Sequence, residues 1–251
     1  TVLKALQAAR PDIVVSAAAY TAVDRAEDEP ERAFAVNEAG AGHVAAAAAS
    51  LGVPVIHLST DYVFAGDGAG GRAETDPTGP QGVYGASKLA GEAAVARANP
   101  RHLILRTAWV YSPFGANFVR TMLRLAAERE EISVVGDQWG NPTSALDIAD
   151  AILHAAPALD GEDSGLHGLY HLAGAGETNW SGFARHILAV SRAYGGPSAT
   201  VREIASADYP TRATRPLNSR LSSARFSGTF GWTAPDWKRS TEAVVARLVG
   251  G

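Results

Sequence analysis

Residues 83–90 read VYGASKLA, and the architecture expected of the whole chain follows from them. Their Ala, Leu and Lys content favours a helix, in which Tyr84 and Lys88 lie on one face. A phenol beside an ammonium is a proton donor with an electrostatic partner, because the positive charge favours the phenolate and lowers the tyrosine pKa. Such a phenol can pass a proton at neutral pH. The same spacing also occurs by chance in ordinary amphipathic helices, so the pair needs support from elsewhere.

Residues 53–64, VPVIHLSTDYVF, supply that support. The apolar run predicts a buried parallel strand that ends in the Ser-Thr-Asp cluster at 59–61. Ligands of open α/β sheets bind beyond the carboxyl ends of strands, so this cluster stands where a ligand would bind. A strand that ends in hydroxyls and precedes a Tyr/Lys helix resembles the short-chain dehydrogenase/reductase superfamily. Thr60, Tyr84 and Lys88 resemble its hydroxyl–tyrosine–lysine triad.

Composition bounds the class of protein. The 251 residues suit one large α/β domain, or one domain with a smaller lobe, and 46% hydrophobic residues supply a sizeable core. The formal net charge of -4 gives no general attraction to nucleic acid. The chain has no cysteine, which excludes disulfides, thiol catalysis and Cys-ligated metals. No run of about 18 apolar residues predicts a membrane span and no signal peptide is recognised, so we expect a cytoplasmic protein.

The N-terminal half alternates strands and helices, which predicts a parallel sheet through about residue 110. Residues 13–19, IVVSAAA, read as a buried strand that ends in small side chains. These side chains either let a flat nicotinamide or adenine ring approach the backbone or pack against a helix. Residues 30–51 predict one long helix. Within it, Asn37 either hydrogen-bonds active-site backbone or faces solvent.

A third buried strand is predicted at 102–111, where Trp109 either stacks on a sugar ring or caps the sheet edge. His57 lies in mid-strand and is interpreted as a core histidine. The looser pattern beyond residue 135 predicts a smaller lobe. We therefore expect a Rossmann-like, doubly wound parallel sheet in a dinucleotide-binding domain at 1–135. Residues 136–251 would mainly form a C-terminal substrate-binding lobe, with some segments returning to the first domain.

Six stretches together resemble the dTDP-4-dehydrorhamnose reductases, extended short-chain reductases that complete dTDP-L-rhamnose synthesis. They are AAAYTAVDRAEDEP (17–30), VIHLSTDYVF (55–64), VYGASKLAGE (83–92), LRTAWVYS (105–112), NFVRTMLRLAAEREE (117–131) and RPLNSRLSSARF (215–226). Sugar-nucleotide dehydratases of the same superfamily carry an Asp-Glu pair after the threonine. Asp61-Tyr62 stands at that place here, so dehydration lacks its acid and base.

The resemblance implies reduction of the C4 ketone of a dTDP-4-keto-6-deoxy-L-hexose, with NADPH or NADH as the cofactor, giving dTDP-L-rhamnose. Tyr84 would protonate the ketone oxygen. Lys88 would hold the nicotinamide ribose and lower the tyrosine pKa, and both residues would contact the cofactor. Thr60 would hydrogen-bond the reacting oxygen or the tyrosine.

The resemblance also implies further contacts. Asp61 would contact the sugar and Trp109 would pack on the sugar face, while Ala18, Ala19 and Thr21 would line the cofactor. The substrate would be a small nucleotide sugar, and a homodimer is compatible with the family. The glutamate set that binds magnesium at the dimer interface of some relatives is not evident, so no metal is predicted.

One feature departs from the family. Its members begin with a strand and a Gly-rich turn that binds the pyrophosphate at a helix N-terminus. This sequence contains neither that turn nor the acidic or basic residue that selects NAD or NADP. We expect the unit to be missing from the sequence, because a protein that had lost it would expose a sheet edge prone to aggregation. The alternative is a protein without a dinucleotide site.

Two other functions stay open at this point. One is a related 4-ketoreductase of another deoxysugar pathway, with Trp109 and residues 137–144 setting the choice of sugar. The other is a non-catalytic regulatory subunit resembling that of methionine adenosyltransferase. The intact set of Thr60, Tyr84 and Lys88 favours an enzyme over the regulatory subunit.

Overall fold

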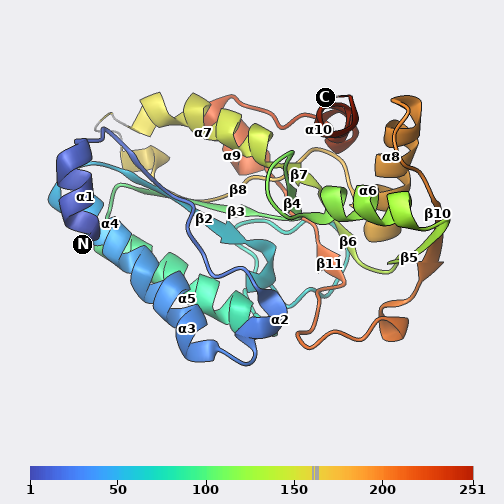
Figure 1. Cartoon of the computed structure of the whole chain (residues 1–251). Helices are drawn as coiled ribbons and strands as arrows, with labels where there is room; N and C mark the ends of the chain where they lie inside the picture. The colour runs from blue at the N-terminus through green and yellow to red at the C-terminus, as the bar shows by residue number, and fades with distance from the viewer. Residues whose placement is uncertain (160, 162–163, 251) are drawn as a thin grey trace.

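The computed structural model describes residues 1–159, 161 and 164–250, and its larger part is a parallel sheet with helices on both faces (Figure 1). The strand order is β1-β2-β3-β8, and every neighbouring pair is parallel. The strands are β1 (Val14–Ser16), β2 (Val55–Thr60), β3 (His102–Thr107) and β8 (Gly168–His171). The predicted Rossmann-like α/β sheet is therefore confirmed.

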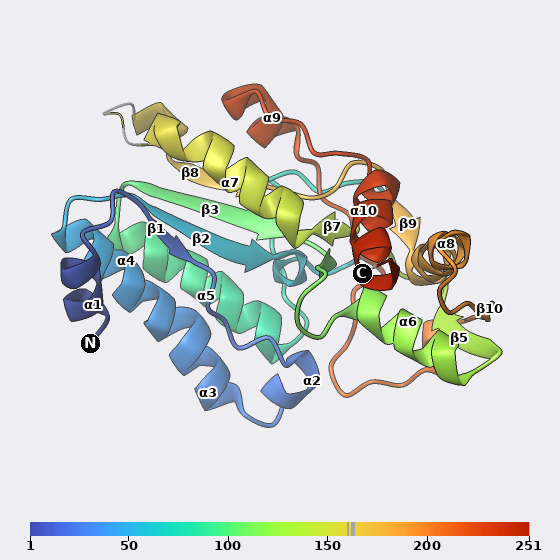
Figure 2. The same ribbon diagram turned by 45° about the horizontal axis from the view of Figure 1, so that its top comes forward.

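Successive side chains of the strands point to opposite faces of the sheet and build two separate cores. On one face, Val55 and Ile104 pack against helices α4 (Ala41–Ser50) and α5 (Val83–Ala98). Helix α1 (Val2–Ala9) also contributes to this layer through Leu6. On the other face, Ile56, Leu103 and Leu105 pack against α7 (Ala145–Leu159) and α9 (Ala224–Phe230). Figure 2 shows the sheet between these two helical layers.

The helix predicted over residues 30–51 contains a break in its regular winding. It begins as α3 (Pro30–Phe34), widens into a π-helical segment at Ala35–Gly40 and continues as α4. A π-helical segment holds an extra residue and is common at functional sites. Here it carries Asn37, which is buried. The short helix α2 (Val23–Ala26) precedes this helix.

A smaller lobe lies beyond the carboxyl ends of β2 and β3 (Figure 1). It joins a parallel strand pair to three amphipathic helices, whose apolar sides meet around Phe183 and Trp237. Its elements are α6 (Phe118–Glu128), β5 (Glu131–Val135), α8 (Trp180–Ala193), β10 (Thr200–Ile204) and α10 (Trp237–Val249).

Packing therefore assigns α6 and β5, which precede residue 136, to the smaller lobe. By contrast, α7, β8 and α9, which follow it, complete the sheet domain. The functional division between 1–135 and 136–251 stays a prediction.

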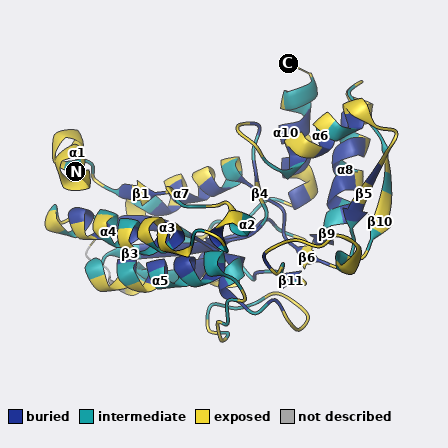
Figure 3. Cartoon of the chain, turned by 60° about the horizontal axis from the view of Figure 1, so that its bottom comes forward, coloured by how far each residue is buried: buried dark blue, intermediate teal, exposed yellow. Residues whose placement is uncertain are grey.

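Short strands stand between the two parts. β4 pairs with β7, and β6 lies between β11 and β9. Their bounds are β4 (Val110–Tyr111), β6 (Trp139–Gly140), β7 (Thr143–Ser144), β9 (Thr178–Asn179) and β11 (Asn218–Ser219). Buried residues line the inner sides of the strands and helices in both parts (Figure 3). Within the described residues, no helix is both long and apolar enough to cross a bilayer.

Candidate active site

The carboxyl end of β2 and the first turn of α5 meet at one corner of the sheet. Thr60 is the last residue of β2, and its hydroxyl hydrogen-bonds Tyr84, the second residue of α5. The Thr60 hydroxyl also lies 3.1 Å from Asp61 Oδ1 and accepts a hydrogen bond from the Tyr62 amide at 3.2 Å. Lys88 follows Tyr84 one turn along α5. The structure thus brings together the hydroxyl and the phenol that the sequence pattern paired.

Two glycines allow α5 to come this close to its neighbours. A Cβ atom on Gly85 would stand 2.2 Å from the carbonyl oxygen of Tyr62, and one on Gly91 would stand 2.1 Å from that of Asn37. Both distances are far inside van der Waals contact, so any larger residue would push the helix away. The Tyr84 hydroxyl depends on this close approach for its contact with Thr60.

The Lys88 side chain is buried, and strand β2 holds its ammonium. Nζ donates to the carbonyl oxygen of Leu58 at 2.6 Å and lies 3.3 Å from His57 Nε2. Burial lowers the pKa of Lys88 to about 8, and the charge of Glu92 partly opposes that shift. Lys88 is therefore protonated in most molecules at neutral pH.

Tyr84 has a higher pKa than the sequence pattern predicts. Burial raises the pKa of Tyr84 to about 12; hydrogen bonding to Thr60 lowers it and the charge of Asp61 raises it further. The prediction that Lys88 brings this pKa below its ordinary value is wrong for this structure, because burial raises the pKa and outweighs the hydrogen bond to Thr60. Tyr84 is consequently a protonated phenol at neutral pH.

Asp61 stands beside this pair and is 4% exposed. Burial raises the pKa of Asp61 to about 6, and hydrogen bonds with Ser219 and Thr60 only partly oppose that rise. Within the described residues, its Oδ2 atom is buried without a hydrogen-bond partner. Buried acceptors are almost always satisfied in folded proteins. This oxygen is therefore suited to accept a hydrogen bond from a ligand.

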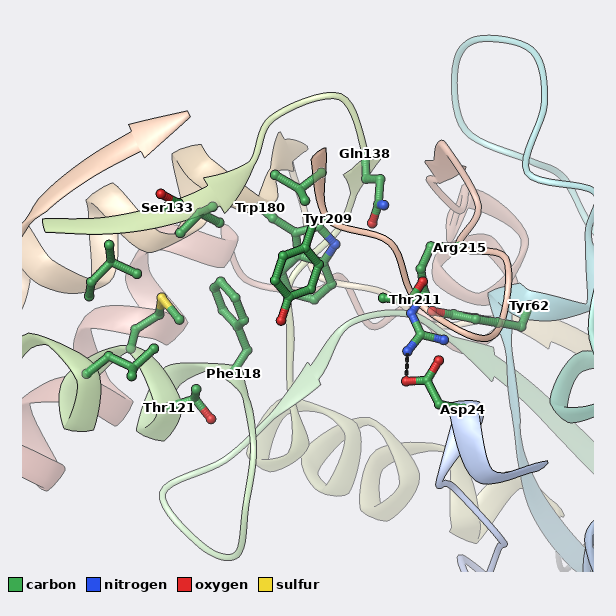
Figure 4. A pocket seen from close by; sticks show the side chains of 15 residues that line it. Asp24, Tyr62, Phe118, Thr121, Ser133, Gln138, Trp180, Tyr209, Thr211 and Arg215 are labelled. Carbon is green, nitrogen blue, oxygen red and sulfur yellow. Dashed lines mark hydrogen bonds and ion pairs between the residues drawn. The ribbon is translucent and has the colours of Figure 1, made fainter. Parts of the chain in front are cut away.

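A cleft of about 390 Å³ opens between this corner and the smaller lobe. Asp24, Tyr62 and Arg215 stand on one side of it, and Phe118 and Trp180 stand on the other (Figure 4).

Of these two tyrosines, Tyr62 lines the cleft and Tyr84 does not. The two rings meet edge to face, with centroids 5.5 Å apart. Tyr62 thus connects the cleft to the Thr60–Tyr84 pair.

Arg215 and Asp24 form an ion pair at the rim of the cleft, at 2.6 Å between Nη2 and Oδ2 (Figure 4). The Asp24 Oδ1 atom also accepts a hydrogen bond from the Ala213 amide at 3.0 Å. Within the described residues, Nη1 of Arg215 is buried without a partner. The guanidinium thus has donor capacity left for a ligand in the cleft.

Trp109 lies behind the wall of the cleft rather than on it. Its indole stacks on Trp180 with ring centroids 3.6 Å apart and planes 11° apart. A Cβ atom on Gly140 would stand 2.5 Å from the same indole. Trp109 also adopts a φ of 50°, a left-handed conformation that is strained for a bulky residue. Contact between Trp109 and a sugar stays a prediction, while Trp180 is the indole that lines the cleft.

The predicted cofactor-lining residues lie in the loop after β1. Ala18 and Thr21 are exposed and Ala19 is half-buried, so the loop offers small side chains at the carboxyl end of the strand. Their contact with a cofactor stays a prediction.

Asn37 fixes this loop to α5. Its Oδ1 accepts from the Tyr20 amide at 2.8 Å, and its Nδ2 donates to the Tyr20 carbonyl at 3.1 Å and to Ser87 Oγ at 3.0 Å. Of the two alternatives for Asn37, the structure takes the bond to backbone and not the solvent-facing position. Glu27 forms a second link to the start of α5, because its Oε1 accepts a hydrogen bond from the Val83 amide at 2.9 Å.

No group of three or more His, Asp or Glu side chains in the described part of the chain is arranged to hold a metal ion. His171 binds the Arg72 carbonyl through Nδ1 at 2.9 Å, and burial lowers its pKa.

The family model for the RmlD substrate binding domain matches residues 1–249. The chain belongs to this family. A dTDP-4-dehydrorhamnose reductase of Sinorhizobium fredii is 52% identical over 250 residues, which cover 99% of the chain and 84% of that relative. One of Escherichia coli K12 is 45% identical, covering 98% of the chain and 83% of the relative.

Solved structures of the family share the fold. A dTDP-4-dehydrorhamnose reductase of Clostridium acetobutylicum is similar with a TM-score of 0.91 and 34% identity, covering 98% of this chain and 84% of that one. One of Bacillus anthracis, solved in complex with NADP, has a TM-score of 0.89 and 36% identity over the same shares. The family membership expected from the motifs is thereby confirmed.

Proposed function

We propose that this protein reduces the C4 ketone of a dTDP-4-keto-6-deoxy-L-hexose with NADPH and so gives dTDP-L-rhamnose. One observation carries the proposal. The Thr60 and Tyr84 hydroxyls are hydrogen-bonded at the carboxyl edge of the sheet, with the Lys88 ammonium one turn along the same helix. The named relatives are reductases of such a substrate, and the Bacillus anthracis relative was solved with NADP.

The carboxyl edge of the sheet fits a nicotinamide cofactor. The small residues Ala18, which is exposed, and Ala19, which is half-buried, leave room for a flat ring beside the end of β1. Thr21 and Lys88 offer polar groups to a ribose. We assign cofactor contacts to these residues and to Tyr84. When bound, the cofactor supplies the hydride that C4 receives.

Tyr84 supplies the proton. Its raised pKa keeps the phenol protonated at neutral pH, so the phenol can transfer its proton to the ketone oxygen as negative charge develops there. The carbonyl becomes a secondary alcohol and Tyr84 is left as a phenolate. The hydroxyl of Thr60 and the positive charge of Lys88 then stabilise that phenolate.

The cleft is the proposed site for the nucleotide sugar. The unpaired Oδ2 of Asp61 would accept a hydrogen bond from a sugar hydroxyl beside Tyr84. The Nη1 group of Arg215 would donate to an oxygen of the diphosphate. Trp180 lines the apolar side of the cleft, with Trp109 stacked behind it.

Oxidation of NADPH on addition of dTDP-4-keto-6-deoxy-L-lyxo-hexulose to the intact protein tests the proposal. Turnover in the wild type that Tyr84→Phe abolishes would support it. Tight binding of the nucleotide sugar without turnover would favour a ketoreductase for another 4-keto sugar. No turnover and no binding would contradict the proposal and favour the regulatory-subunit alternative.

A homodimer and a cytoplasmic location stay predictions from the family. Light scattering of the purified protein tests the first, and cell fractionation tests the second.

A further inference from the structure

His57 is a buried histidine that the proposed reaction does not use. It is 0% exposed and lies in the middle of β2, between strand β1 and helix α5. Its Nδ1 is 3.4 Å from Ser16 Oγ, and its Nε2 is 3.3 Å from Lys88 Nζ. Burial lowers the pKa of His57 to about 3, and the charge of Lys88 acts in the same direction. The imidazole is therefore neutral at any physiological pH.

The partners of His57 decide which nitrogen carries its proton. A neutral imidazole has one donor and one acceptor, whereas a lysine ammonium only donates. Nε2 must therefore be the acceptor for Lys88, and Nδ1–H points to the Ser16 hydroxyl. This tautomer is assigned from the hydrogen-bond network. The line Ser16–His57–Lys88 consequently runs in one direction across β1, β2 and α5.

Two of the three N–H groups of Lys88 are directed toward consecutive residues of β2. One donates to the Leu58 carbonyl at 2.6 Å and another points to His57. The same strand ends in Thr60 two residues later. Strand β2 therefore sets the position of the ammonium relative to the Thr60 hydroxyl, and one N–H remains.

We propose that His57 is a positioning residue that aims the Lys88 ammonium, so that its remaining N–H is directed to the catalytic corner. This inference rests on the proposed function, in which Lys88 acts as a charged group beside Tyr84. The competing interpretation is a core histidine that only fills space. The two differ in one respect, because a space-filling histidine does not influence the proton of Lys88.

The charged and titratable groups around Lys88 make that influence measurable. On α5 they are Tyr84 and Glu92, and on β3 the Arg106 guanidinium faces Glu92. On β2 the group is His57, which is neutral, so its replacement changes hydrogen bonding to Lys88 without changing net charge. Removing an acceptor of the charged form lowers the pKa of a lysine.

The chain offers a direct readout, since it contains only three lysines, Lys4, Lys88 and Lys238. Lysine labelled with ¹³C at Cε therefore gives three NMR signals, which Lys4→Arg and Lys238→Arg variants assign. We compare His57→Leu, which removes the acceptor, with His57→Gln, whose amide oxygen can replace Nε2. In the Leu variant we expect the Lys88 pKa to fall by about one unit. In the Gln variant it should stay near the wild-type value, while the Lys4 and Lys238 signals do not move.

Kinetics of the intact protein give the second readout. In the Leu variant kcat should fall about tenfold, as expected for loss of one hydrogen bond to a charged group. The alkaline limb of its pH profile should move to lower pH, and the KM for the nucleotide sugar should stay unchanged. A wild type without turnover would contradict the proposed function, while the NMR titration would still decide the role of His57.

An unchanged Lys88 pKa in a folded Leu variant would overturn the inference, as would equal shifts in the Leu and Gln variants. If the Leu variant does not fold, Ser16→Ala removes the partner that orients the imidazole. It should lower the Lys88 pKa in the same direction by a smaller amount, and no change there would overturn the inference.

Discussion

The two walls of the cleft differ in how far apart their residues lie along the chain. One wall contains Tyr62, and behind it lie Thr60, Tyr84 and Lys88, which come from one β–α unit within residues 55–98. Thr60 and Lys88 are buried. The opposite wall gathers Phe118, Trp180 and other residues from separate segments of the smaller lobe. The arrangement of the proposed catalytic residues thus follows from local spacing, whereas the shape of the substrate cleft depends on long-range packing.

The sharpest test of the first wall is Tyr84→Phe. We expect turnover to fall by about 10²- to 10⁴-fold, the usual contribution of a general acid, because the proton donor is lost. Cofactor affinity, measured by fluorescence titration, should change little. Tyr62→Phe is the matched control, since the two rings are in contact with centroids 5.5 Å apart. Similar losses in both variants would show that Tyr84 has no special role.

The contribution of this wall to stability can be tested at Glu92. Its carboxylate accepts hydrogen bonds from Arg106 at 2.9 and 2.7 Å and from Ser59 at 2.5 Å. Glu92→Gln leaves the buried charge of Arg106 unpaired, so the free energy of unfolding should fall by about 3–5 kcal/mol in urea denaturation.

The control for this change lies on the surface of the smaller lobe. Glu128→Gln removes an exposed partner of Arg124 and should cost about 1 kcal/mol or less. Equal losses in the free energy of unfolding for the Glu92 and Glu128 variants would contradict the prediction that only the buried ion pair matters for stability.

Asp61, which is buried beside Thr60, makes the stability of the protein depend on pH. Its pKa is about 6 in the folded protein and 3.8 ordinarily, so the folded state binds the proton more tightly. The Asp61 contribution should therefore lower the free energy of unfolding by up to about 3 kcal/mol as the pH rises from 4 to 7. Asp61→Asn should remove that slope, be more stable than wild type at pH 7.5 and bind the nucleotide sugar less well. An unchanged slope in denaturation at several pH values would contradict this.

The smallest effect is expected for Arg215, which stands at the rim of the cleft. Arg215→Ala should raise the KM for the nucleotide sugar about tenfold, with kcat nearly unchanged, because a charged hydrogen bond to the diphosphate is lost. Arg212→Ala is the control. Arg212 lies on the same loop as Arg215, but it forms an ion pair with Asp28 and does not line the cleft. Steady-state kinetics that show a lower kcat and the same KM would contradict a role of Arg215 in substrate binding.

The sequence predicted the parallel sheet and the placement of Tyr84 and Lys88 one turn apart on a helix, because short periodic patterns and an i, i+4 spacing are local properties. The pairing of Thr60 with Tyr84 was expected only from the resemblance to the family. The Arg215–Asp24 pair joins residues 191 positions apart, and no local pattern indicates it. Trp180 was not predicted as a site residue for the same reason, since only folding brings its ring against Trp109. The pKa of Tyr84 was predicted in the wrong direction because spacing reveals a neighbouring charge but not the degree of burial.

The π-helical segment Ala35–Gly40 has a consequence for the mutations that this helix can tolerate. It lengthens one helix by a residue without lengthening its axis, so the helix surface is rotated on either side of it. Asn37 reaches the loop after β1, while Ala41, Ala45 and Ala48 still face the sheet. Deletion of one residue within 35–40 would therefore turn Asn37 relative to these alanines and release the loop, while the core sequence stays intact. This helix should therefore be sensitive to a change of length within 35–40 as well as to substitution of Asn37.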